Sequence, residues 1–139
     1  KRNIMDKKLF LDTNIVIDII DEARKSHQKA KETLLKIIDE DYEVYVSEDM
    51  ISTIYYILKG NQKVLLFFKS ILKEWNVVPF GVDVINQAID FCLDNGSDLE
   101  DTMQCICAKN YECKLFLTND KKFVDCGIDI VNYDRFLIL

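Results

Sequence analysis

Residues 9–18 read LFLDTNIVID, and this stretch decides the fold of the chain. Its first three residues form a continuous apolar run, which predicts a short strand buried on both faces. Asp12 ends the run, and the apolar residues after it predict a helix over 14–21. A buried strand that passes directly into a helix is typical of α/β domains, in which helices cover a parallel sheet.

The remainder of the chain repeats this alternation of short strands and helices. Four further apolar runs predict strands at 44–46, 77–78, 115–117 and 128–131, and an apolar tail follows at 136–139. Between these runs, apolar residues three and four positions apart predict helices. Strands separated by helices form βαβ units, so we expect one α/β domain with helices on both faces of a mainly parallel sheet.

The predicted helices have expected starts and expected inward faces. Ser47, Asp83 and Asp98 each precede a helical pattern and have side chains that can cap a helix N-terminus. The spacing of the apolar residues indicates which side of each helix packs on the sheet. The positions expected to face inward are Ala30, Leu34, Ile37, Ile38, Met50, Ile51, Ile54, Ile57, Leu58, Val64, Leu65, Phe68, Ile71, Leu72, Val84, Ala88, Ile89, Cys92, Leu99, Met103, Ile106 and Cys107.

Length and composition are those of an ordinary globular domain. The chain has 139 residues, of which 49% are hydrophobic and 30% charged, and its net charge is −6. This charge argues against a broadly basic nucleic-acid-binding surface, although a metal-dependent nuclease needs acidic side chains at its centre. No apolar run approaches the ~18 residues of a membrane span. Residues 1–8 lack the apolar stretch of a signal peptide, so we expect a cytoplasmic location.

The cysteine pattern does not indicate a metal site. The five cysteines are an odd number and include no C-x-x-C pair, and the one histidine, His27, lies far from them in sequence. Zinc binding is therefore not expected. Cys92, Cys105, Cys107, Cys113 and Cys126 are expected to be reduced and mostly buried, because a free cysteine behaves as a small hydrophobe.

Acidic residues stand at the ends of predicted strands and at the start of a predicted helix. Asp12 follows the first strand, Asp120 follows the fourth, and Asp98, Glu100 and Asp101 open the helix before the fourth strand. Ligands of open parallel sheets bind beyond the carboxyl ends of the strands. If the first and fourth strands are neighbours, these acids share one crevice. Their mutual repulsion would be relieved by a divalent cation, which could then act on a phosphodiester.

Each of these residues also has a simpler explanation when it is taken alone. An Asp after a strand is often a turn former or a helix cap, as Asp12 and Asp98 could be. Glu100 could serve only to complement the helix dipole, and Lys121 and Lys122 could be ordinary solvated surface. The argument for a site therefore rests on the ordered combination of residues.

The combination resembles the PIN-domain family. Residues 9–18 are similar to the family's opening motif, in which an apolar strand runs into Asp-Thr-Asn. Residues 97–101, SDLED, resemble the later acidic motif at a helix start. Residues 117–123, LTNDKKF, resemble the closing motif after the fourth strand. The resemblance covers nearly the whole chain in order and spacing, so residues 1–139 are expected to form a single PIN-like domain.

The resemblance implies a fold, an activity and partners. The fold is a five-stranded parallel sheet in the order 3-2-1-4-5, and the activity is Mg²⁺- or Mn²⁺-dependent cleavage of RNA. Many members are bacterial toxins that dimerise and are silenced by an antitoxin, which implies a homodimer and a cognate antitoxin as partners. The roles implied are metal-site carboxylates for Asp12, Asp101 and Asp120, a site hydrogen bond for Asn14, a fixed loop for Thr118, and RNA contacts for Lys121 and Lys122.

One position departs from the family pattern. The helix after the second strand usually carries a Glu or Asp, and the matching position here is Thr53. Its hydroxyl adds no negative charge, although Asp49 lies four residues earlier on the same helical face and could partly substitute. The alternative function is therefore a PIN-like binding module without catalysis. If the alignment holds, Thr53 is expected to point into the cavity of Asp12 and Asp101.

Two other α/β families fit the sequence less well. A haloacid-dehalogenase-type phosphatase needs a second Asp two residues after the first, and Asn14 stands there, which cannot act as a general acid. A phospho-receiver domain needs an Asp after the third strand, where Pro79 stands.

Some aromatic residues of the helices are also expected to line an interface, since one core this size need not bury Tyr55, Tyr56, Phe67 and Phe68 together.

Overall fold

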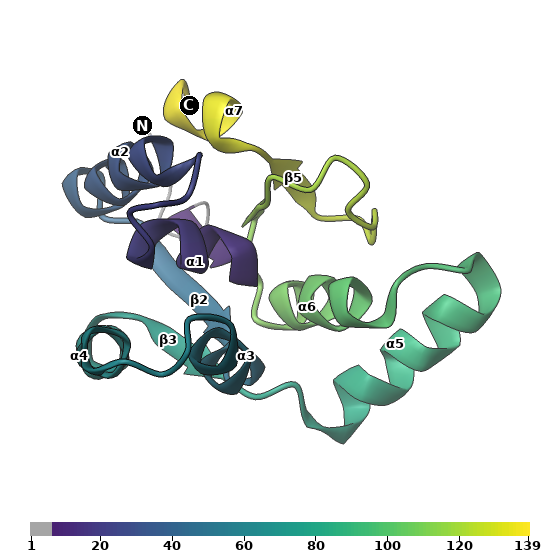
Figure 1. Cartoon of the computed structure of the whole chain (residues 1–139). Helices are drawn as coiled ribbons and strands as arrows, with labels where there is room; N and C mark the ends of the chain where they lie inside the picture. The colour runs from purple at the N-terminus through teal and green to yellow at the C-terminus, as the bar shows by residue number, and fades with distance from the viewer. Residues whose placement is uncertain (1–6) are drawn as a thin grey trace.

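A computed structural model describes residues 7–139 of the protein, and residues 1–6 lie outside the described part (Figure 1). The expectation of no signal peptide therefore falls largely on residues outside the described part. Five strands pair in parallel in the order β3-β2-β1-β4-β5, as expected. They are β1 (Lys8–Leu11), β2 (Glu43–Ser47), β3 (Asn76–Val78), β4 (Leu115–Leu117) and β5 (Asp129–Val131).

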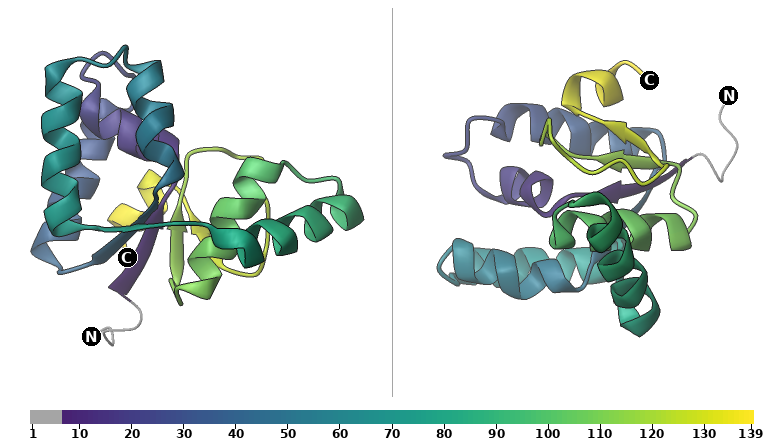
Figure 2. Two further views of the ribbon diagram at one scale, coloured as in Figure 1. Left: turned by 90° about the horizontal axis from the view of Figure 1, so that it is seen from below. Right: turned by 90° about the vertical axis from the view of Figure 1, so that its right-hand side faces the viewer.

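Helices cover both faces of this sheet, which confirms the predicted fold class (Figures 1 and 2). Alternate strand residues face opposite layers. Leu9 and Leu11 pack with one set of helices, and Phe10 packs with the other. The first layer contains α1 (Thr13–Ile20), α2 (His27–Asp39), α3 (Asp49–Ile57), α4 (Gln62–Glu74) and α7 (Tyr133–Leu137). The second contains α5 (Gly81–Asn95) and α6 (Leu99–Asn110).

One of the three predicted helix caps is observed. Asp98 caps α6, because its Oδ2 accepts a hydrogen bond of 2.9 Å from the backbone N–H of Asp101. The prediction for Ser47 is wrong: this residue pairs with Val78 as the last residue of β2. The prediction for Asp83 is also wrong, since α5 has already begun at Gly81. Strand β2 extends one residue beyond its expected end, and α5 begins three residues before its expected start.

The expectation that all five cysteines are reduced is wrong for one pair. Cys105 of α6 and Cys126, in the loop before β5, form a disulfide. Cys107 and Cys113 are free and buried, as expected, and Cys92 is free and half-buried. The two bonded residues come from separate elements that meet in one core layer. Their separation of 21 residues in sequence gives no sign of this meeting.

Several apolar positions expected to face inward are exposed. Ile38, Ile57, Leu65, Leu72, Ile89 and Leu99 all have large exposed fractions, so their predicted burial is wrong. The apolar side of these helices is wider than the part that contacts the sheet. Tyr56 is 85% exposed, whereas Phe68 is buried, so the core does not bury all of the clustered aromatic residues.

Across residues 7–139, every helix falls short of the length and apolar character that crossing a bilayer requires.

Candidate active site

The centre of the candidate site is Asp12, at the carboxyl end of β1. Its backbone N–H donates to the Leu117 carbonyl at 3.0 Å, which ties it to the neighbouring strand β4. Its carboxylate is buried and accepts two side-chain hydrogen bonds, from Thr118 Oγ1 at 2.7 Å and from Gln104 Nε2 at 3.2 Å. Two strands and helix α6 therefore fix this carboxylate in one position.

Thr118 links Asp12 to the next acidic residue. The Thr118 hydroxyl oxygen accepts a hydrogen bond of 3.1 Å from the backbone N–H of Asp120, while the hydroxyl donates to Asp12. Asp120 Oδ1 accepts a hydrogen bond of 2.9 Å from the Lys122 N–H, which closes a turn after β4. One hydroxyl thus connects the buried acid to the loop that carries the exposed one.

Helix α6 directs a third acidic residue toward this pair. The pKa of Asp101 is raised to about 7, first by burial and then by the charges of Asp98, Asp12, Asp120 and Glu100. The first turn of α6 therefore lies within the electrostatic field of the acids that follow β1 and β4. Carboxylates from three distant parts of the sequence act on one another.

Two further groups extend this field. Burial raises the pKa of Glu100, and the charges of Asp49, Asp12 and Asp98 add to the shift. Burial also raises the pKa of Asp12, with the charge of Asp120 in the same direction, while the hydrogen bonds from Thr118 and Gln104 oppose it. Both shifts favour the protonated acids, chiefly because burial penalises the charged form and to a smaller extent because like charges repel at this edge of the sheet.

The donor chemistry suits a hard divalent cation. Carboxylate oxygens are the ligands that Mg²⁺ and Mn²⁺ prefer, and a bound cation would relieve the like-charge repulsion that adds to the effect of burial on these pKa values. Within residues 7–139, however, no three His, Cys, Asp or Glu side chains are already grouped closely enough to hold an ion. Metal ligation by Asp12, Asp101 and Asp120 therefore stays a prediction.

The remaining predicted site residues lie on α1, on α3 and in the turn after β4. The Thr53 hydroxyl donates to the Asp49 carbonyl of its own helix at 3.3 Å, the bond that a threonine one turn into a helix commonly makes. Asp49 itself begins α3, and its charge acts on Glu100. Asn14 is exposed on α1. Lys121 and Lys122 are exposed in the turn after β4. Their predicted roles stay predictions.

Sequence reasoning missed Gln104. This residue is buried, and its amide N–H donates to Asp12, while its Oε1 has no hydrogen-bond partner within the described residues. It lies three positions after Asp101 and so on the same side of α6. A glutamine at that spacing from an acid, among the inward residues of a helix, was the available signal.

Comparisons with known proteins identify the family and the fold of the chain. Residues 9–128 match the PIN domain family. The chain is 33% identical to ribonuclease VapC1 of Aquifex aeolicus (strain VF5) over 134 residues, which cover 94% of this chain and 93% of that protein. The fold is similar to Mycobacterium tuberculosis VapC20, a toxin that cleaves the sarcin–ricin loop, with a TM-score of 0.72, 15% identity, and 86% and 95% coverage of the two chains. It is also similar to a chain of a toxin–antitoxin complex from Klebsiella pneumoniae, with a TM-score of 0.69, 17% identity, and 90% and 97% coverage.

Proposed function

This chain belongs to the PIN-domain family, and from that premise we propose that it is a Mg²⁺- or Mn²⁺-dependent endoribonuclease, the toxin of a bacterial toxin–antitoxin pair that acts on RNA in the cytoplasm. The observation that carries the proposal is the buried Asp12 carboxylate, held by Thr118 and Gln104 within the field of Asp101 and Asp120. The relative from Aquifex aeolicus, a ribonuclease similar along nearly its whole length, supports the same reaction.

In the proposed reaction, the protein holds acids in fixed positions around one phosphodiester. Asp12, Asp101 and Asp120 would hold the cation. When bound, this ion supplies charge neutralisation at the phosphate and a more acidic water for attack on phosphorus. Thr118 keeps Asp12 and the Asp120 backbone at a fixed separation, and Gln104 holds the other oxygen of Asp12. Glu100 supplies further negative charge where Thr53 supplies none.

The proposed partners are a second copy of the chain and a cognate antitoxin. Helices α3 and α4 follow one another in the chain, and both expose apolar side chains. Exposed apolar patches mark protein interfaces. The fold of the Klebsiella pneumoniae toxin–antitoxin complex supports an antitoxin as one occupant. The exposed apolar side chains of the two helices are Tyr55, Tyr56, Ile57, Leu65, Leu66 and Leu72.

The second candidate function is a PIN-like binding module without catalysis. The observation that favours it is Thr53, which stands at the position of a family acid and bonds to its own helix backbone. A module of this kind would bind RNA or a protein and leave phosphodiester bonds intact. Metal-dependent cleavage by the purified protein decides between the two functions.

We expect the purified protein to cleave single-stranded RNA in millimolar Mg²⁺ or Mn²⁺ and to lose this activity in EDTA. The reason is that the acids repel one another and the phosphate unless a cation neutralises them. Gel analysis of labelled RNA measures the cleavage, and readdition of metal is the control. Intact RNA under all metal conditions, from a folded protein that binds metal, would support the binding module.

Thr53→Glu is expected to tighten Mn²⁺ binding by roughly three- to tenfold, because affinity at hard-cation sites follows the number of charged ligands. In EDTA the same change should lower the melting temperature through added like-charge repulsion. Titration calorimetry and thermal melts measure the two effects. Thr53→Gln is the control, because glutamine has the same length as glutamate and lacks its charge. Equal metal affinities in all three proteins would place Thr53 outside the site.

A further inference from the structure

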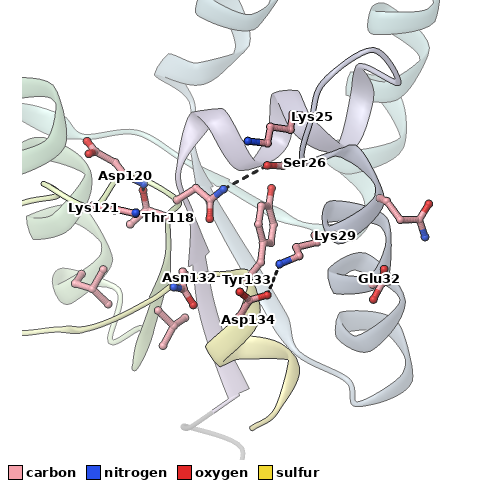
Figure 3. Close-up of a pocket in the computed structure, with 14 residues that line it drawn as sticks. Lys25, Ser26, Lys29, Glu32, Thr118, Asp120, Lys121, Asn132, Tyr133 and Asp134 are labelled. Atoms are coloured by element: carbon pink, nitrogen blue, oxygen red, sulfur yellow. Dashed lines mark hydrogen bonds and ion pairs between the residues drawn. The ribbon is translucent and has the colours of Figure 1, made fainter.

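A second feature lies beside the acidic site. A cavity of about 740 Å³ opens between the start of α2 and the carboxyl ends of β4 and β5 (Figure 3). Thr118 and Asp120 line it, so it is continuous with the acids described above. Its volume lies within the ~300–1,000 Å³ range typical of ligand sites. Among its other lining residues only Lys121 has an expected role, RNA contact, and the residues from α2 and from the end of β5 have none so far.

The cavity differs from the acidic site because lysines line it as well as acids. Lys25, Lys29 and Lys121 stand there with Glu32, Asp120 and Asp134, so the formal charges of the lining balance. Lys29 forms an ion pair with Asp134. Lys25 and Lys121 have no acidic side chain within ion-pair distance in the described part of the chain, and both are exposed. Two lysines are therefore available to an anion.

Neutral amides complete the lining between these lysines. Asn119 Nδ2 donates to Ser26 Oγ at 3.4 Å and so connects the loop after β4 to the start of α2. Asn132 accepts a hydrogen bond from the Arg135 N–H through its Oδ1, which leaves its amide N–H groups free for a ligand. Gln28 is exposed at the same opening. Amide groups both donate and accept, as recognition of a base edge requires.

We propose that this cavity binds the RNA nucleotide adjacent to the scissile phosphodiester. Lys25 and Lys121 contact its phosphate, and the amides of Gln28, Asn119 and Asn132 face its base. The assignment rests on the proposed ribonuclease function, because the acids that border the cavity would hold the reacting phosphate. A strand entering along the lysines is attracted electrostatically, whereas the acids alone would repel it.

The test is the charge reversal Lys25→Glu. Lys25 is exposed in the loop before α2, so the fold should be unaffected, and equal melting temperatures establish this. Binding of a labelled single-stranded RNA is measured by fluorescence anisotropy in EDTA at several salt concentrations, and KM for cleavage is measured in Mg²⁺. We expect Kd and KM to rise by roughly five- to tenfold, and the slope of log K against log salt to fall by about 0.7.

The matched control is Lys73→Glu, which makes the same charge change at an exposed lysine of α4 outside the cavity. Among residues 7–139, Lys73 has no acidic partner within ion-pair distance. The control should leave Kd, KM and the salt slope near their wild-type values.

Equal effects of the two reversals would overturn the inference, because the effect would then come from net charge alone. Active wild-type protein with unchanged Lys25→Glu values would overturn the inference but not the ribonuclease function. Wild-type protein that neither binds nor cleaves RNA would overturn both. A loss of antitoxin binding by Lys25→Glu, with RNA binding intact, would reassign the cavity to a protein contact.

Discussion

Asp12→Asn is expected to reduce RNA cleavage by roughly a thousandfold at saturating Mg²⁺, because it removes the central ligand charge of the proposed hard-cation site. The substitution keeps the size of the side chain. Its carbonyl oxygen can still accept from Thr118 or from Gln104, the two donors that now bond the Asp12 carboxylate. Cleavage is measured as kcat/KM on labelled RNA, and the melting temperature is measured in EDTA and in Mg²⁺.

The stability of Asp12→Asn separates a chemical role from a structural one. Burial raises the pKa of Asp12, so the buried position penalises the charged form relative to water, and a neutral amide should be tolerated in EDTA. Loss of activity with a preserved fold and a smaller Mg²⁺-induced rise in melting temperature supports the metal role. Cleavage within about fivefold of wild type would contradict it, since a missing central ligand costs far more than that. Thr118→Ser, which keeps the hydroxyl, is the matched control.

Much of the site followed from the sequence because it depends on strand ends. Leu9–Leu11 and 115–117 are short apolar runs typical of buried strands. Asp12 follows the first run directly, and Asp120 comes after Thr118 and Asn119 beyond the second. Once β1 and β4 pair, their carboxyl ends lie side by side, so Asp12 and Asp120 lie at the same edge of the sheet. The placement of these residues is thus a consequence of local pattern together with the parallel order of strands.

The features that the sequence did not reveal depend on contacts between distant elements. Gln104 reaches Asp12 across 92 positions, and Cys105 meets Cys126 through the packing of α6 on the loop before β5. No spacing rule reports such a meeting. The alignment placed Thr53 on the helix after the second strand and predicted which way its side chain points. The Thr53 hydroxyl instead donates to the Asp49 carbonyl of the same helix, because a threonine in a helix has such a carbonyl within reach. Periodicity also overestimated burial on α3 and α4, since it does not report how much of each helix contacts the sheet.

The pH dependence of stability in EDTA is expected to identify Asp101. Its pKa is raised from 3.8 to about 7 in the folded protein, first by burial and then by Asp98, Asp12, Asp120 and Glu100. Between these two values the folded state holds a proton that the unfolded state has released. Stability should therefore fall as pH rises from about 4 toward 7, with the full loss present above 7.

Asp101→Asn removes the group that titrates. In EDTA at pH 8 this variant should melt above the wild type, by roughly 3 °C once solvent screening of this partly exposed group is allowed for. The difference should disappear near pH 4, where the wild-type carboxyl is protonated in the folded protein. Thermal melts by circular dichroism across this range measure the effect. Asp94→Asn, the same charge change at an exposed site of α5, should show no such crossover with pH.

Metal should reverse the order of the two proteins. If Asp101 is a metal ligand, a cation should bind the folded wild type and raise its melting temperature by mass action, whereas Asp101→Asn lacks that ligand and should respond weakly. At pH 8 we therefore expect the variant to be the more stable protein in EDTA and the less stable one in millimolar Mn²⁺, with RNA cleavage reduced by roughly a hundredfold or more. A variant that is stabilised in EDTA, combined with a wild type whose melting temperature does not respond to metal, would contradict the metal site. Asp101 would then be only an acid at a helix start whose charged form is unfavourable in the folded protein. The binding module would then be the better explanation of the function.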